Sequence, residues 1–257
     1  MAVILLIFMF TTHVQAEEAS SPLLKLDAIA DQALQLTKLN RPEEAKQLLE
    51  YFSKEFSSTA LQDKRLSMDE IRILTVSHHQ ALKSVVSTTA EPIQRVQDVT
   101  AFRLVMDAIS SQYEPLWTEM EEPIMSAFQQ MKAAAESKNH QSYQASLNTF
   151  LTQYNIIQPS LRVDVPVEMT QAMDAKIQYI DQYRNQLLEK GNNMEQFDQL
   201  EDDLQHLFDS VQEDEADPSL WWVIITTGSI IISTLSYVGW RKYKGEKEEK
   251  SPKKLND

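Results

Sequence analysis

Apolar side chains recur every three or four positions along most of residues 26–207, which is the spacing of an α-helix with one buried face. The first two apolar stripes, residues 26–36 and 45–56, flank a break that runs from Leu39 to Pro42. Because a polar segment ending in proline interrupts a helix, these two stripes predict a helical hairpin.

Further stripes predict further helices with short connections. Ser67, followed three residues later by Glu70, is typical of a capping box and predicts a helix that begins there. The next helix is predicted to begin near Pro92. Pro123 falls within the stripe over residues 117–131, so we expect it either to kink that helix or to start a new one.

The second half of the chain shows the same period with different boundaries. Residues 143–157 predict a helix that Pro159 ends, and residues 163–167 read as an extended connector because they alternate valine with polar residues and proline. Residues 173–187 predict one helix, with Gly191 as its C-terminal cap.

A last amphipathic stripe covers residues 197–207. Short connections between neighbouring helices favour antiparallel packing. We therefore predict an all-α domain over residues 17–212, built as a bundle or a stack of helical hairpins.

Residues 220–240 form an uncharged, largely apolar run that is followed at once by Arg241 and Lys242. At about 1.5 Å of rise per residue, such a run is long enough as a helix to cross a bilayer. Tryptophan or tyrosine stands near both of its ends, which is the usual position of aromatic belts. The run predicts one C-terminal transmembrane helix.

The charges beside this run predict its orientation. Residues 241–257 hold seven basic and four acidic side chains, whereas residues 213–219, interpreted as an acidic stalk, hold no basic one. The positive-inside rule then places the tail, residues 241–257, in the cytoplasm and the helical domain outside. The expected location is the cell membrane, as a single-pass protein.

The N-terminus is consistent with export. Residues 2–10 are all apolar, and Val14-Gln15-Ala16 resembles a signal-peptidase site, so residues 1–16 are interpreted as a signal peptide. An uncleaved anchor is the alternative, although it would need a longer apolar run. Both alternatives export the middle of the chain.

Composition narrows the possible functions of the exported part. The chain has a formal net charge of −14, and leaving out its basic tail makes the remainder −17, so binding to nucleic acid is not expected. There is no cysteine, which excludes disulfides and thiolate metal sites. Only four glycines occur, and neither a Rossmann nor a P-loop pattern is present.

Local motifs for catalysis or metal binding are not found. His78 lies on an apolar stripe and has no histidine or glutamate four residues away, so we interpret it as a core residue rather than a metal ligand. We predict no catalytic residue, no metal and no cofactor. Arg103 and Asp107 lie four apart on one predicted helix and are a candidate structural ion pair.

The predicted span carries small polar residues at intervals of three and four, namely Thr226, Ser229, Ser233 and Ser236. They form a candidate seam for packing against another transmembrane helix, either a partner's or that of a second copy. Alternatively, these hydroxyls bond back to the carbonyl groups of their own helix.

Several segments resemble the YpjB family of sporulation proteins from endospore-forming Gram-positive bacteria. They are residues 41–52 (RPEEAKQLLEYF), 100–108 (TAFRLVMDA), 114–117 (EPLW) and 154–161, which contains Gln-Pro-Ser-Leu. The resemblance covers most of the helical domain and the order of signal, domain and span. It implies an association with sporulation and supplies no catalytic motif.

Three functions are compatible with these features. The first is a membrane-anchored, non-catalytic interaction domain that recruits or organises an unknown protein partner during sporulation. The second is an extracytoplasmic ligand sensor that signals through a partner, which a large cavity with converging polar groups would favour. The third is an enzyme that acts on the cell wall, for which the sequence shows no paired carboxylates in a recognisable setting.

Overall fold

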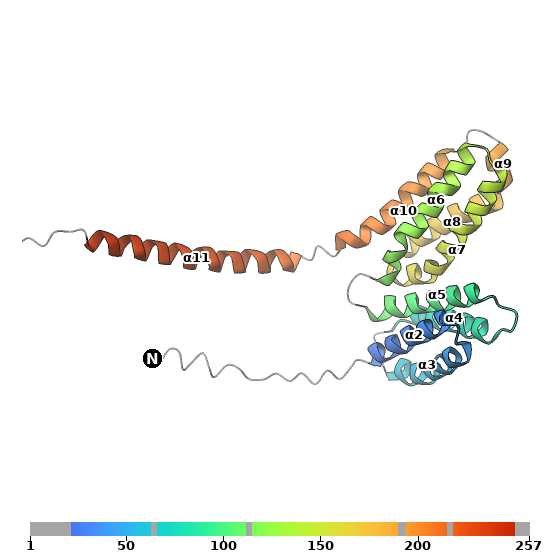
Figure 1. Cartoon of the computed structure of the whole chain (residues 1–257), viewed down its shortest axis with the longest axis horizontal. Helices are drawn as coiled ribbons and strands as arrows, with labels where there is room; N and C mark the ends of the chain where they lie inside the picture. Colours follow the sequence, from blue (N-terminus) through green and yellow to red (C-terminus); the bar gives the residue numbers. More distant parts are fainter. Residues whose placement is uncertain (1–21, 63–65, 112–114, 190–193, 215–217, 250–257) are drawn as a thin grey trace, which may run out of the picture. The chain divides into compact units, whose positions relative to one another are not determined.

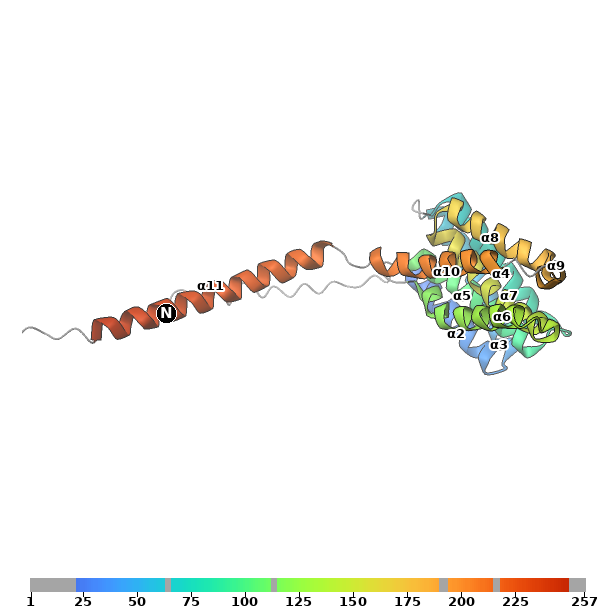
Figure 2. The ribbon, with the colours of Figure 1, turned by 90° about the horizontal axis from the view of Figure 1, so that it is seen from above.

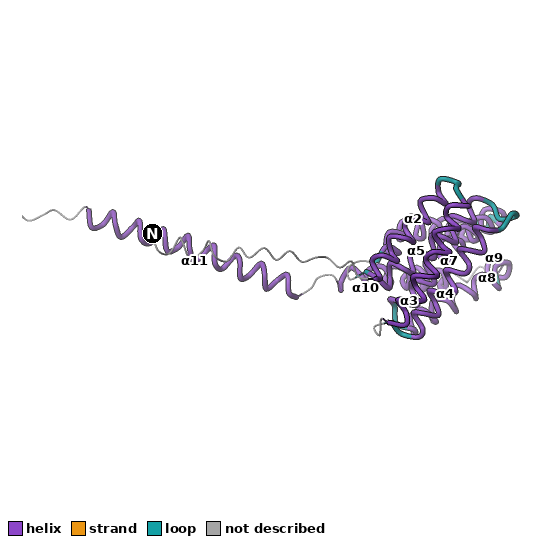
Figure 3. The backbone as a smooth tube through the Cα atoms, turned by 90° about the horizontal axis from the view of Figure 1, so that it is seen from below, coloured by secondary structure: helices purple, strands orange, loops and turns teal. Residues whose placement is uncertain are grey.

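The computed structural model describes residues 22–62, 66–111, 115–189, 194–214 and 218–249. Throughout these ranges the chain is helix or loop, without a strand (Figure 3). The prediction of an all-α fold is therefore confirmed for the described residues. Two compact units are distinguished, one up to Phe208 and the other from Asp209 onwards.

The first unit begins with two helical hairpins, α2 with α3 and α4 with α5 (Figure 1). Their bounds are α2 Pro22–Lys38, α3 Pro42–Gln62, α4 Met68–Val86 and α5 Pro92–Ser110. Asn40 turns the first hairpin in the left-handed region, with φ at 55°, and the Arg41 N–H then reaches the Leu36 carbonyl at 2.9 Å.

The predicted capping box at the start of α4 is present. The Glu70 N–H donates to Ser67 Oγ at 3.1 Å, and the Ser67 N–H donates to Glu70 Oε2 at 2.5 Å. These contacts satisfy two N–H groups that the first turn of a helix leaves without partners.

The core of these four helices is built from their facing apolar stripes. Phe52 and Phe102 meet edge to face at 4.8 Å between ring centroids, and both are almost completely buried. His78 packs against both rings at 5.3 Å, and its Nε2 lies 2.8 Å from the Leu49 carbonyl oxygen. Burial lowers the pKa of His78, so a neutral ring fills this place in the core.

After α5 the chain passes through the 3-10 helix η2 Leu116–Met120 into α6 Glu121–Glu136. Pro123 therefore lies in the first turn of a new helix, where a missing N–H costs nothing. This is one of the two outcomes that the sequence left open. A second left-handed residue, Lys138 with φ at 53°, closes the hairpin between α6 and α7.

Helix α7, His140–Asp164, is longer than predicted because Pro159 lies inside it instead of ending it. The connector between α7 and α8 consists of Val165 and Pro166 alone and is shorter than the predicted one, residues 163–167. Packing explains the difference: Ile157 and Leu161, on either side of the proline, are buried, and their burial offsets the cost of the interruption. Helix α7 packs against α6 and also against α5, so it joins the two halves of this unit.

The helix predicted over residues 173–187 is divided. Helix α8 runs over Val167–Gln182 and α9 over Arg184–Glu189, with a break at Tyr183, whereas Gly191 lies outside the described residues. Arg184 holds the break by donating from Nε to the Asp181 carbonyl at 3.1 Å and from Nη1 to Gln144 Oε1 at 2.8 Å.

Helix α10, Met194–Asp214, packs beside α6 and α8 (Figure 2). Its apolar side is buried, with Phe208 lying 5.7 Å from Trp117 between ring centroids. On its flanks, Lys132 of α6 binds Asp198 at 2.5 Å and Glu201 at 2.6 Å, and Lys176 of α8 pairs with Asp203. These ion pairs connect α10 to both α6 and α8.

In the second unit, α11 runs over Pro218–Glu249 and so covers the predicted span and part of the predicted tail. Among the described residues, no helix combines the length and the apolar character that crossing a bilayer requires. The side chains of residues 220–224 of the predicted span lie outside those described. Also outside the described residues are the predicted signal peptide, residues 215–217 of the predicted stalk and residues 250–257 of the tail.

Candidate functional site

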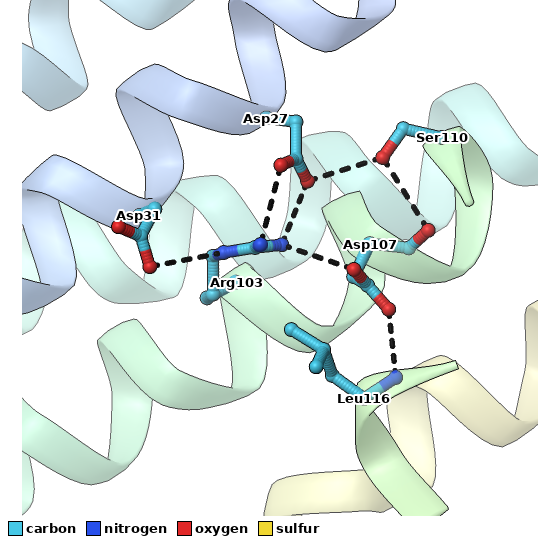
Figure 4. A network of polar contacts seen from close by, with 6 residues as sticks. All are labelled: Asp27, Asp31, Arg103, Asp107, Ser110 and Leu116. Atoms are coloured by element: carbon cyan, nitrogen blue, oxygen red, sulfur yellow. Dashed lines mark hydrogen bonds and ion pairs between the residues drawn. The ribbon is translucent and has the colours of Figure 1, made fainter. Parts of the chain in front are cut away.

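Arg103 is a buried cation held among carboxylates (Figure 4). Its Nη1 and Nη2 donate to the two carboxylate oxygens of Asp27 on α2, at 2.7 and 3.2 Å. Nη1 also lies 3.5 Å from Asp107 Oδ1, one turn later on α5, and Nε lies 3.7 Å from Asp31 Oδ1. The structure thus brings the predicted pair together within a larger group, which we call the Arg103 network.

The Arg103 network also joins η2 to α5. Asp107 Oδ2 accepts the N–H of Leu116, the first residue of η2, at 2.7 Å, and Ser110 Oγ donates to Asp27 Oδ1 at 3.1 Å (Figure 4). Burial raises the pKa of Asp27 in spite of the nearby guanidinium. Through these contacts the network positions α2, α5 and η2.

A cavity of about 720 Å³ lies between helices α4, α5, α7 and α8. We call it the interhelical cavity. Its volume is in the range of small-molecule sites. The apolar part of its lining consists of Ile73, Val76, Ala101, Pro159 and Val167. Val76 and Val167 are 65% and 57% exposed, so the cavity has an apolar rim that is open to solvent.

Five ionisable side chains line the interhelical cavity, and four of them form pairs. Arg72 Nη2 lies 3.0 Å from Asp69 Oδ1, and Arg162 Nη2 lies 3.0 Å from Asp174 Oδ2. The fifth is Asp98 on α5, whose Oδ2 is shielded from water and has no hydrogen-bond partner among the described residues.

Asp174 is more fully bonded than an ordinary surface carboxylate. Tyr154 donates its hydroxyl to Oδ1 at 2.8 Å, and Gln158 Nε2 lies 3.0 Å from both oxygens. Burial opposes ionisation, but these hydrogen bonds, together with the one from Arg162, lower the pKa of Asp174. Asp174 therefore joins α7 to α8 as a stable anion.

Pro159 shapes the wall of the interhelical cavity through the backbone. Because proline has no N–H, the carbonyl group of Asn155, four residues earlier, loses the partner it would have in a regular helix. Asn155 and Pro159 both line the cavity. The turn of α7 that contains this backbone acceptor therefore forms part of the cavity wall.

The polar seam predicted along the span lies on α11. The Ser229 hydroxyl donates to the Ile225 carbonyl at 2.6 Å, which is the backbone bonding that the sequence offered as the alternative to helix packing. Thr226, Ser233 and Ser236 are exposed in this unit. No group of three or more potential metal ligands occurs among the described residues, and His78 lies in the aromatic core.

Comparison with known proteins places the chain in a family. A family model described as "Sporulation protein YpjB (SpoYpjB)" matches residues 23–252. The chain belongs to the YpjB family. A relative from Bacillus subtilis (strain 168), itself called YpjB, is 38% identical over 248 residues, which are 96% of this chain and 93% of the relative. No solved structure matches.

The resemblance to the YpjB family seen in the sequence is thus confirmed. The family match spans all four helices around the interhelical cavity and continues through the whole of α11. The cavity itself was missed from the sequence, since its lining comes from residues up to about 100 positions apart. Two local signals could have drawn attention to it: a proline inside a helical stripe and an aspartate among the apolar residues of α5.

Proposed function

We propose that this YpjB-family protein is a non-catalytic sporulation protein, anchored in the cell membrane by residues 220–240, that holds its helical domain outside the cytoplasm to bind a partner. One observation supports the anchor above all: bulky apolar side chains of α11 are exposed around the whole helix. Ile230, Ile231 and Ile232 are consecutive and are 65%, 53% and 66% exposed.

Successive residues of an α-helix point about 100° apart, so three in a row cannot all face one side. A helix of a water-soluble domain would instead place its apolar residues on one stripe, as α10 does. The basic residues that follow from Arg241 onwards support a cytoplasmic tail through the positive-inside rule.

The anchor can be tested by fractionating cells that make the full-length protein. We expect it in the membrane fraction, and we expect the combined changes Ile231→Asp and Ile232→Asp to release it, since an aspartate in mid-membrane costs about 3 kcal/mol. Ile93→Asp is the matched control, because Ile93 is equally bulky and 60% exposed but lies on α5. Recovery of the unchanged protein in the soluble fraction would refute the anchor.

The orientation needs a separate measurement. Protease added to intact protoplasts should digest the helical domain and spare a tag fused after residue 257. A protected helical domain would contradict export. The partner can be sought by crosslinking the helical domain in sporulating cells and identifying what is captured with the wild-type protein but not with the released double variant.

A second candidate function is supported by the interhelical cavity: the helical domain binds a small ligand and passes the signal to a partner. Ala101→Leu would add bulk to the cavity wall, and Ala172→Leu adds the same bulk to an exposed position of α8. If the cavity is used, only the first variant lowers spore formation while circular dichroism stays unchanged. Equal spore counts for the two variants would argue against the sensor.

A further inference from the structure

We propose that the interhelical cavity binds a small organic amine, with the protonated nitrogen near Asp98 and an apolar body against the cavity walls. This inference names the ligand class for the sensor function above and depends on it. Two ion pairs in the cavity lining leave one carboxylate, that of Asp98, without a cation.

The two guanidinium groups in the cavity are already neutralised. Arg72 lies against Asp69, and Arg162 against Asp174, each at 3.0 Å. An anionic ligand at either guanidinium would lie beside the carboxylate already paired with it, and the two negative charges would repel each other. The cavity is therefore poorly suited to a carboxylate or a phosphate.

Asp98 is the one ionisable residue among those described in the cavity lining that belongs to neither ion pair. Its Oδ2 is out of contact with water and has no hydrogen-bond partner among the described residues. Arg95, three residues earlier on α5, donates from Nη2 to the Ser87 carbonyl at 2.8 Å. A carboxylate oxygen without a hydrogen-bond partner is favourable for a donor or a cation that reaches it, so such a group is stabilised beside Asp98.

The walls define the rest of the ligand. Ala101 and Pro159 line the cavity, and the exposed Val76 and Val167 stand at its rim. Such a surface favours an apolar body next to the charged nitrogen.

The test uses full-length protein in mild detergent and three probes of similar shape: phenethylamine, phenethyl alcohol and phenylacetate. Binding is followed by saturation-transfer NMR titration. We expect the amine to bind, and the alcohol and the carboxylate to bind at least about tenfold more weakly, because a charged hydrogen bond is lost. Equal binding of amine and alcohol would overturn the proposal.

Variants locate the site. Asp98→Asn should weaken amine binding by about tenfold or more, whereas Asp98→Glu should retain it. Asp202→Asn is the control, since it removes the same charge from an exposed position of α10 and leaves partitioning into detergent unchanged. Unaltered amine binding by Asp98→Asn, with circular dichroism like that of the wild type, would overturn the assignment.

The outcome can be separated from that of the sensor function. Ala101→Leu should also weaken amine binding if the probe occupies the cavity. If Asp98→Asn abolishes amine binding while Ala101→Leu leaves spore formation intact, the ligand class stands and the sensor function fails. If amine binding does not depend on Asp98 but Ala101→Leu lowers spore formation, the cavity is used for another ligand and this inference fails.

Discussion

Replacing Arg103 by methionine should be among the most destabilising single changes in the helical domain. The substitution keeps much of the side-chain volume but removes the guanidinium from Asp27 and Asp107. The side chains of these three residues are 10%, 23% and 12% exposed, so two partly dehydrated carboxylates would lose their cation.

The magnitude follows from this burial. Removing one partner of a buried ion pair costs about 3–5 kcal/mol, and because Asp27 retains some contact with water we expect the lower end, about 3 kcal/mol. The exposed pair between Arg72 and Asp69, whose side chains are 73% and 81% exposed, supplies the control. Arg72→Met should change stability by less than about 1 kcal/mol.

The assay is urea unfolding of the full-length protein in mild detergent, followed by circular dichroism. A double variant, Arg103→Met with Asp27→Leu, should regain part of the loss because the dehydrated charge leaves together with its partner. The penalty of Arg103→Met alone should shrink in acid, where protonation discharges Asp27. If Arg103→Met costs no more than Arg72→Met, or if the double variant is no better than the single one, the reasoning is wrong.

Three further predictions concern single positions. Ser67→Ala removes the side-chain cap of α4 and should cost about 1 kcal/mol in urea unfolding, and no measurable loss would contradict the cap. Phe128→Ala, at a fully buried ring 5.4 Å from Phe150, should cost about 3–5 kcal/mol, and a loss below about 1 kcal/mol would show that this core is not well packed. Asp164 lies at the surface, but its Oδ2 accepts the indole N–H of Trp117 at 2.7 Å, and the loss of water around the carboxylate raises its pKa from 3.8 to about 6. Between these two pH values the folded state keeps a proton that the unfolded chain has lost. The stability of the wild type relative to Asp164→Asn should therefore fall as the pH rises from about 4 to about 6 and level off above that. A stability difference independent of pH would contradict the pKa shift.

The sequence predicted the helical class because burial in this domain follows the 3.6-residue period closely. Phe52 and Leu204 lie on the apolar stripes predicted over residues 45–56 and 197–207, and both are buried. The capping box at Ser67 was equally readable, since its two partners are local.

The errors arose where tertiary packing overrides a local signal. Pro159 usually marks a helix end, but burial of the residues on either side keeps α7 continuous. The break at Tyr183 depends on Arg184 reaching Gln144, which lies 40 positions earlier, and no local pattern contains that contact. The predicted pair of Arg103 with Asp107 is present at 3.5 Å, but the closest partner of Arg103 is Asp27, which lies 76 positions away in the sequence and so leaves no local signal.

The ion pairs that hold α10 against α6 and α8 have a mechanical consequence. Helix α11 follows α10 in the sequence, so a force applied through α11 reaches the helical domain through α10. This force acts first on the ion pairs that the two lysines form with Asp198, Glu201 and Asp203. These pairs lie near the surface, so salt weakens them. We therefore expect α10 to separate from α6 and α8 more readily at high ionic strength, while the hairpins that carry the Arg103 network stay folded.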